Sequence, residues 1–217
     1  ASAFCWITWC RHHVLVPTYE DSPRCGRRWG RLYLLLPDTE SVHSEASDHW
    51  TDYWQQGNLT SLPRGFASNY EGEFLQFWEA QFAGLARDAC VLDVCSGNGS
   101  IALLAKGYSA RHQLDLQVKA TDAAHIDMAR VIDSHPDLSQ HIQAIEFLPG
   151  VRLEALAVAP ASCDLVTNQF GIEYSDWAMS ASNIYRMLKP GGCFAMVCHS
   201  ADSKILQAME SQQADYE

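Results

Sequence analysis

The chain has 217 residues, of which 47% are hydrophobic and 19% charged, and its formal net charge is −11. Such a composition is typical of a globular protein, and the sequence lacks the uninterrupted apolar run of about 18 residues that a membrane-spanning helix requires. A chain this acidic repels nucleic-acid phosphates and anionic lipid, so a small molecule is the expected partner, with no nucleic acid and no membrane.

The first 45 residues differ from the rest of the chain. They contain three tryptophans and an arginine-rich turn over 24–28, and they show no sustained helical or strand period. Only the apolar run 31–36, which ends at Pro37, is typical of a strand. We therefore expect residues 1–45 to be an atypical appended segment, poorly ordered, with at most one short strand.

Residues 46–86 predict an N-terminal helical cap. Across 70–86, large apolar side chains recur at the spacing of one helix face: Phe74, Phe77, Trp78, Phe82 and Leu85. From residue 87 onward, strand and helix patterns alternate. The predicted strands are 90–94, 116–120, 142–147, 164–167 and 193–198, and the predicted helices are 100–107, 123–133 and 175–187.

This alternation predicts a doubly wound α/β domain over residues 87–217, with a mainly parallel sheet and helices on both faces. In such sheets a ligand binds beyond the carboxyl ends of the strands, where the strand order reverses. The loops that follow the first, second and fourth predicted strands are therefore the candidate site.

A glycine-containing loop follows the first of these strands, and residues 93–102 read DVCSGNGSIA. Gly97 and Gly99 allow a ligand to approach the backbone closely, and the amino end of the next helix offers free N–H groups. Taken alone, the glycines with Ala102 also fit a nicotinamide or flavin fingerprint.

Asp122 ends the second predicted strand, 23 residues beyond Gly99. A carboxylate at this place accepts hydrogen bonds from both hydroxyls of a ribose. It is equally a candidate N-cap for the following helix. The glycine loop and the acid together predict an adenosyl ligand.

The complete pattern resembles the class I S-adenosylmethionine (SAM)-dependent methyltransferases, of the type that acts on small molecules in bacteria. Residues 91–99 read VLDVCSGNG and resemble the first motif of that family, 164–174 resemble its fourth strand and the following loop, and 187–192 resemble the turn before its fifth strand. Residues 53–78, which precede this domain, resemble the N-terminal cap of some members of the family. The resemblance implies a Rossmann-like fold, SAM as cofactor and methyl transfer to a small-molecule acceptor.

The resemblance also implies a set of cofactor-binding residues: Asp93, Cys95, Ser96, Gly97, Asn98, Gly99, Asp122, Ala123, Val151, Arg152, Asn168 and Gln169. Two departures stand out. Cys95 stands where the family usually has its first glycine. If the loop requires a positive φ at this position, a cysteine there is strained. The run 149–152 lacks the usual acid near adenine, which leaves backbone groups of Val151 or Arg152, or else Glu154, for this contact.

The family's fold continues beyond the fifth strand with a helix and two further strands. Here only 203–209 is able to begin that helix before the chain stops at Glu217. We therefore expect a domain that is truncated at its C-terminus and lacks the last strands, with one uncovered sheet edge.

Methyl transfer requires a general base only if the acceptor carries a proton that leaves early. The candidates are His199 at the end of the fifth strand and Glu173 and Tyr174 in the loop after the fourth. Packing roles are the alternative for all three. Tyr53, Trp54 and Tyr70 are able to face the sulfonium, or else pack within the cap. The histidines show no metal-ligand spacing, so we expect no metal.

Two other functions remain open. A nicotinamide-dependent oxidoreductase fits the glycines, but the only tyrosine–lysine pair at suitable spacing is Tyr185 with Lys189, at a helix end. A SAM-binding fragment without activity is the third possibility. Finally, we expect reduced, buried thiols near the strands at Cys90, Cys95, Cys163, Cys193 and Cys198, which favours a cytoplasmic location.

Overall fold

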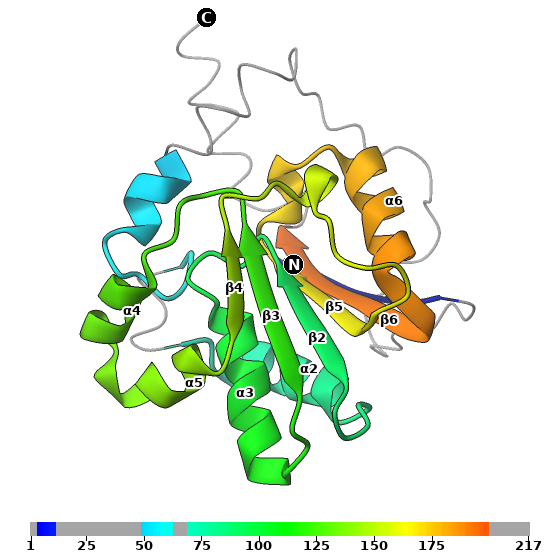
Figure 1. Ribbon diagram of the computed structural model, residues 1–217, viewed down its shortest axis with the longest axis horizontal. Coiled ribbons are helices and arrows are strands. Elements are labelled where there is room, and N and C mark those ends of the chain that lie inside the picture. The colour runs from blue at the N-terminus through cyan, green and yellow to red at the C-terminus, as the bar shows by residue number, and fades with distance from the viewer. Residues whose placement is uncertain (1–3, 12–48, 63–68, 200–217) are drawn as a thin grey trace, which may run out of the picture.

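The computed structural model describes residues 4–11, 49–62 and 69–199. Within them, six strands form one sheet in the order β1-β6-β5-β2-β3-β4 (Figure 1). The strands are β1 (Phe4–Cys10), β2 (Cys90–Val94), β3 (Gln117–Asp122), β4 (Glu146–Pro149), β5 (Cys163–Gln169) and β6 (Leu188–His199). The helices are α2 (Gly72–Phe82), α3 (Ser100–His112), α4 (Met128–Ser134), α5 (Ser139–Gln143) and α6 (Trp177–Met187), together with a short helix over 49–54.

The sheet is mixed. Strands β2 to β6 pair in parallel, whereas β1 pairs antiparallel with β6. The chain proceeds from β2 outward to β4 and then returns to place β5 on the other side of β2, so the strand order reverses at β2. The doubly wound, mainly parallel α/β fold predicted from the alternating pattern is confirmed.

Helices cover both faces of the sheet, and each face has its own core. On one face α2 and α3 contribute Trp78, Phe82 and Ile101, which are almost fully buried. On the other face α6 contributes Ile184 and Met187. The separation of α6 from α2 and α3 by the sheet is visible in Figure 1.

Most predicted elements are present, with shifted ends. Strand β2 has the predicted bounds, but the strand expected at 142–147 is wrong at its start. Residues 139–143 form α5 because Leu138, Ile142 and Ile145 lie at helical spacing and pack into the α2–α3 core. Helix α4 begins at Met128 rather than at Ala123, because the Asp127 carboxylate caps it by accepting hydrogen bonds from two backbone N–H groups.

The sequence did not predict strand β1, which lies inside the segment expected to be appended. It pairs with β6 along its whole length, and its Trp6 ring packs against Phe74 and Phe77 of α2. A disulfide joins Cys10 to Cys193, so the expectation of a reduced thiol at Cys193 is wrong. The short strand expected at 31–36 and the helix expected at 203–209 lie outside the described residues.

Cysteines 90, 95, 163 and 198 have free thiols. Among the helices that the structure describes, none has the length and apolar character needed to cross a bilayer.

Candidate functional site

A cavity lies beyond the carboxyl ends of β2, β3 and β5, at the point where the strand order reverses. Its wall combines the loop after β2, the end of β3, the segment after β4, the loop after β5 and parts of the cap. The lining residues that the argument below uses are Trp50, Trp54, Ser61, Tyr70, Cys95, Ser96, Asp122, Ala123, Val151, Arg152, Glu154, Gln169, Phe170 and Tyr174.

Asp122 connects the cavity wall to the glycine loop. One oxygen of its carboxylate accepts a hydrogen bond from Gly97 N at 2.7 Å, and the other accepts one from Ala124 N at 2.8 Å. Burial raises the pKa of this carboxyl, although both hydrogen bonds oppose the rise. A carboxylate accepts about four hydrogen bonds, so two acceptor positions remain for a ligand.

Close approaches by aromatic rings fix the loop after β2. A Cβ at Gly97, where φ is +53°, would lie 2.4 Å from a ring carbon of Trp54. A Cβ at Gly99, where φ is +81°, would lie 2.8 Å from the Phe147 ring. Both positions therefore require glycine for backbone conformation and for space. The rings of Trp54 and Phe147 occupy the space beside these two glycines.

Asp93 does not line the cavity. Its carboxylate is fully buried and accepts hydrogen bonds from Thr167 Oγ1 at 2.8 Å and from Ala102 N at 3.2 Å. Burial raises the pKa of Asp93 to about 7, although these two hydrogen bonds act to lower it. The side chain ties the first turn of α3 to β5 and supports the loop from behind.

Asn98 and Asn168 also hold backbone rather than line the cavity. The Asn98 amide donates to the carbonyls of Trp54 at 2.9 Å and Asn58 at 2.7 Å, which fastens the cap to the glycine loop. The Asn168 amide donates to Val94 O at 2.8 Å, and its oxygen accepts from Ile172 N. These two amides fix the relative positions of the cap and of the loops after β2 and β5.

Cys95 adopts a φ of +50°, the left-handed conformation that glycine favours. It packs so closely that a Cβ at Gly171 would lie 2.4 Å from the Cys95 Cβ. Burial raises the pKa of the Cys95 thiol well above its ordinary value, and Asp122, Glu154, Glu173 and Asp93 raise it further. The thiol is therefore neutral and lies in a field set by carboxylates.

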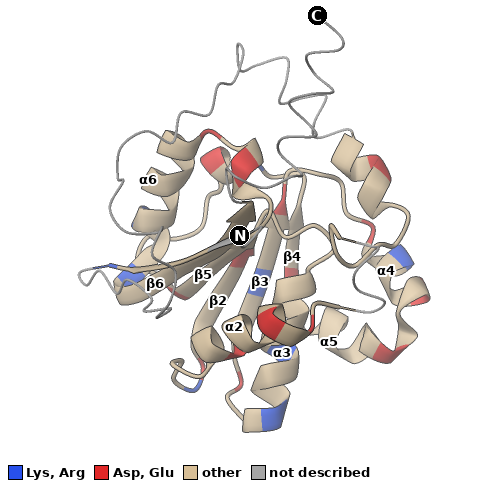
Figure 2. Ribbon diagram, turned by 180° about the vertical axis from the view of Figure 1, so that it is seen from behind, with Lys and Arg blue, Asp and Glu red and all other residues tan. Residues whose placement is uncertain are grey.

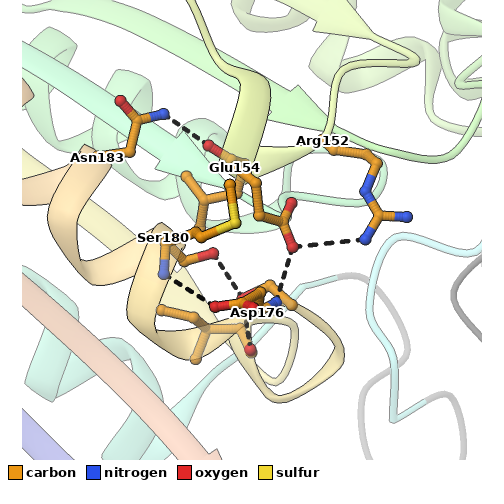
Figure 3. Close-up of polar contacts among 9 residues, drawn as sticks. Arg152, Glu154, Asp176, Ser180 and Asn183 are labelled. Carbon is orange, nitrogen blue, oxygen red and sulfur yellow. Dashed lines mark hydrogen bonds and ion pairs between the residues drawn. The ribbon is translucent and has the colours of Figure 1, made fainter. Parts of the chain in front are cut away.

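The segment after β4 forms the far wall. Val151 N donates to the backbone oxygen of Asp122 at 2.9 Å, so this wall is fixed to the end of β3. Figure 3 shows the Glu154 carboxylate turned toward Arg152 and toward the backbone of Asp176, with which it makes contacts of 3.5 and 2.7 Å. Glu154 thus joins this wall to the amino end of α6 and is paired with the one cation found among the described lining residues.

The three candidate bases take different positions. Tyr174 lines the cavity, where burial and the nearby Glu173 raise the pKa of its hydroxyl. His199 and Glu173 do not line it. They pair behind it, with Nδ1 and Oε1 3.5 Å apart, and the His199 ring packs on Phe170.

Some lining residues were not identified from the sequence. Trp50 and Ser61 lie outside every motif, and Phe170 lies in the run 164–174 but was not singled out, because the positions of all three depend on how the cap and the β5 loop fold over the sheet. Gln169 was predicted from the sequence as a cofactor-binding residue, and it lines the cavity. Its oxygen accepts from Trp78 Nε1 at 2.6 Å, while its buried nitrogen faces Tyr70 without a hydrogen bond of good geometry. A ligand oxygen would satisfy this donor.

The tyrosine–lysine pair of an oxidoreductase is not assembled here. Tyr185, on α6, contacts Trp9 of β1 and Arg11, and Lys189 pairs with Asp164 at 2.6 Å. Neither residue lines the cavity.

The model of the ubiE/COQ5 methyltransferase family matches residues 75–216. No curated protein matches the chain. Among solved structures, a phosphoethanolamine N-methyltransferase 2 of Haemonchus contortus in complex with S-adenosyl-L-methionine is 20% identical, with 81% of this chain and 40% of that chain covered and a TM-score of 0.55. YcgJ of Bacillus subtilis is 24% identical, with 63% and 55% covered and a TM-score of 0.49.

The likeness to the Haemonchus protein is one of fold. The chain spans 40% to 55% of the length of these two solved proteins.

Proposed function

The chain belongs to the ubiE/COQ5 methyltransferase family, whose model matches residues 75–216, and on that premise we propose that it transfers the methyl group of SAM to a small-molecule acceptor. The observation that carries the proposal is the Asp122 carboxylate, which lies in the cavity wall beside the glycine loop with two acceptor positions to spare. This is where a doubly wound sheet binds an adenosyl ligand.

Features of the cavity support SAM as the molecule held. Asp122 would accept hydrogen bonds from the ribose hydroxyls, and Val151 and Arg152 border the place for adenine. The Gln169 nitrogen offers a donor that lacks a partner of good geometry. In the Haemonchus protein of the same fold, the solved complex contains SAM. We assign direct contact to Cys95, Ser96, Asp122, Ala123, Val151, Arg152 and Gln169.

The remaining residues of the predicted set act on the cofactor indirectly in this proposal. Asp93, Asn98 and Asn168 hold the loops through the hydrogen bonds described above. Gly97 and Gly99 let the loop take its positive φ values under the aromatic rings of Trp54 and Phe147.

When bound, SAM supplies a methyl group on an electrophilic sulfonium carbon, so the protein has to orient the reactants and exclude water. The cap and the β5 loop serve this purpose, because Trp50, Trp54 and Tyr174 cover the cavity. If the acceptor must lose a proton, Tyr174 is the candidate base that lines the cavity. The Glu173–His199 pair lies behind it and would act on Tyr174 through the charge of Glu173.

Calorimetric titration with SAM and, separately, with NAD tests the proposal. We expect SAM to bind and NAD not to bind, and the reverse result would overturn the methyltransferase assignment. The Asp122→Ala variant should bind SAM about 10- to 100-fold more weakly, because it loses charge-assisted hydrogen bonds to ligand hydroxyls.

Two further variants make that measurement specific. Asp127→Ala removes a carboxylate that likewise accepts hydrogen bonds from two backbone N–H groups, but at the start of α4 and outside the cavity, and it should leave SAM affinity unchanged. Asp122→Asn keeps an acceptor for one loop N–H, so a folded Asp122→Asn protein with weakened binding separates the ribose role from loop support. Unchanged affinity in both Asp122 variants would contradict the assignment.

We also propose a cytoplasmic location. The free thiols at Cys90, Cys95, Cys163 and Cys198 support it, whereas the Cys10–Cys193 disulfide argues for an oxidising compartment. Thiol labelling of the protein from its native cells decides between the two.

A further inference from the structure

Two free thiols lie next to each other at the end of the sheet that is opposite to the cavity. Cys90 is the first residue of β2, and Cys163 is the first residue of β5. These strands pair in parallel from Val91 and Leu165 onward, so the two cysteines lie just before the first pair. Both pack into the core on the α6 face of the sheet. Adjacent strands are about 4.7–4.9 Å apart, within the range of about 4.4–6.8 Å that separates the Cα atoms of a disulfide.

The two thiols differ in accessibility. Cys163 is fully buried, whereas Cys90 is partly exposed, so a small reagent from solvent meets Cys90 first. Ser162 Oγ lies 3.7 Å from Cys163 Sγ and helps to hold that thiol in place. An accessible thiol beside a shielded one is the arrangement in which one cysteine is oxidised and a second resolves it.

Charged side chains of the surrounding elements include Lys119 on β3, Glu146 on β4, Asp164 on β5, Arg186 on α6 and Lys189 on β6. Asp164 Oδ2 accepts hydrogen bonds from Cys90 N at 2.7 Å and from Lys189 Nζ at 2.6 Å, which holds the beginnings of β2, β5 and β6 together. Lys119, the basic residue shown in blue within β3 in Figure 2, pairs with Glu146 at 2.6 Å. Arg186 donates to backbone oxygens of the segment before β5.

This environment divides the two thiols by acidity. A hydrogen bond with Cys163 has the largest influence on Cys90 and lowers the pKa of its thiol to about 7. Lys119 and Lys189 also lower this pKa, whereas burial and Asp164 raise it. The same interaction, together with burial, raises the pKa of Cys163. Cys90 is therefore the thiol that becomes a nucleophilic thiolate near neutral pH, while its neighbour keeps its proton.

We propose that Cys90 is a peroxide-reactive cysteine and that Cys163 resolves its oxidised form into a disulfide between β2 and β5. First the Cys90 sulfur attacks one oxygen of a hydroperoxide, the O–O bond breaks, and the second oxygen leaves as hydroxide or alkoxide and takes a proton from solvent. Then the Cys163 sulfur attacks the sulfenic sulfur, an S–S bond forms, the S–O bond breaks, and hydroxide leaves with the Cys163 proton as water. The two thiols lose two electrons, which the hydroperoxide gains. The pair lies away from the cavity, so this chemistry is independent of the proposed methyl transfer.

Peptide mapping after oxidation tests the proposal directly. The protein is treated with an equimolar amount of hydrogen peroxide at pH 7, its remaining thiols are alkylated, and it is digested with trypsin without reduction. Trypsin places Cys90 in the peptide 88–106 and Cys163 in the peptide 153–186. We expect these two peptides to be joined through Cys90 and to separate on reduction. Because 88–106 also contains Cys95, fragmentation of the joined peptides identifies the bridging residue. A bridge through Cys95, or peroxide treatment without a bridge, would overturn the proposal.

The pH dependence of labelling separates a reactive thiol from a merely structural one. The rate at which iodoacetamide labels Cys90 should be half-maximal near pH 7. In Cys163→Ala the midpoint should rise toward the ordinary thiol pKa of about 8.5. Lys119→Gln should slow labelling at pH 7 by about twofold, because a nearby positive charge is lost. Lys106→Gln removes a lysine of α3 on the other face of the sheet and should change nothing. An unshifted midpoint in Cys163→Ala would contradict the pairing of the two thiols.

Thermal unfolding gives a readout of where the bridge forms. A disulfide between strands that already pair constrains the unfolded chain, so the peroxide-treated protein should melt several degrees above the untreated protein. Cys90→Ser should abolish this rise. A lower melting temperature in the bridged protein would show that β2 and β5 have to leave their native pairing to form it, and would overturn the proposed geometry.

Discussion

Cys95 offers a direct test of the loop conformation, because its φ of +50° strains any residue that has a Cβ. A left-handed conformation costs a non-glycine residue about 1–2 kcal/mol. We therefore compare Cys95→Gly with Cys95→Ala. Both variants remove the sulfur atom, so the loss of its buried contacts cancels between them.

Two terms of opposite sign remain in this comparison. The alanine variant keeps the left-handed strain of about 1–2 kcal/mol. The glycine variant gains backbone freedom in the unfolded chain, which costs it about 0.4–1 kcal/mol. Glycine should therefore be the more stable of the two by about 0.5–1 kcal/mol, which corresponds to a rise in melting temperature of about 1–4 °C in a chain of this size. At an ordinary helical position the order is reversed, by about 1 kcal/mol.

Urea denaturation of both variants at neutral pH measures the difference in the free energy of unfolding. Ala178→Gly, at an exposed position in α6, is the matched control and should lose stability. If Cys95→Ala proves equal to or more stable than Cys95→Gly while the control behaves normally, the loop does not adopt a positive φ at this position and the reasoning is refuted.

Three further predictions concern stability. Burial raises the pKa of Asp93 to about 7, so the folded chain binds one more proton than the unfolded chain between pH 4 and 7. The free energy of unfolding should fall by up to about 4 kcal/mol as the pH rises through that window, relative to Asp93→Asn; parallel curves from urea titrations would contradict this. Gly97→Ala introduces a Cβ 2.4 Å from the Trp54 ring at a φ of +53° and should cost at least about 2 kcal/mol, with a shift in tryptophan emission. Cys10→Ser removes the disulfide with Cys193 and should lower the free energy of unfolding by about 2–4 kcal/mol. Reduction of the parent chain with dithiothreitol should have the same effect. An unchanged melting temperature would show that the disulfide does not stabilise the pairing of β1 with the sheet.

The sequence was most informative where local pattern and function coincide. The run from Val91 to Gly99 predicted both β2 and the loop after it, since buried strand residues and glycines with positive φ leave clear patterns. Asp122 was identified by spacing alone, and it lies in the cavity wall. These features depend on residues close together in the chain.

The sequence was least informative where contacts join distant segments. Nothing near Phe4–Cys10 indicates that it pairs with Leu188–His199, because an edge strand of seven residues has no period that distinguishes it from a loop. The same holds for Trp50, whose place in the cavity depends on the cap folding over β2. The carboxylate of Asp93 has the expected position but a different set of partners, since Thr167 and Ala102 bind both of its oxygens.

This last difference changes how the site is understood to work. The Asp93 carboxylate and the Asn98 and Asn168 amide nitrogens hydrogen-bond to the loops and the cap around the cavity, whereas the Asp122 carboxylate lies in the cavity wall. Loops that are held in this way do not need to be ordered when a ligand arrives, so less conformational entropy opposes binding. A methyl transfer that depends on alignment benefits from the same rigidity. The polar residues behind the loop therefore act on the reaction through geometry, and substituting them should lower the affinity for SAM even though the side chains do not face the cavity.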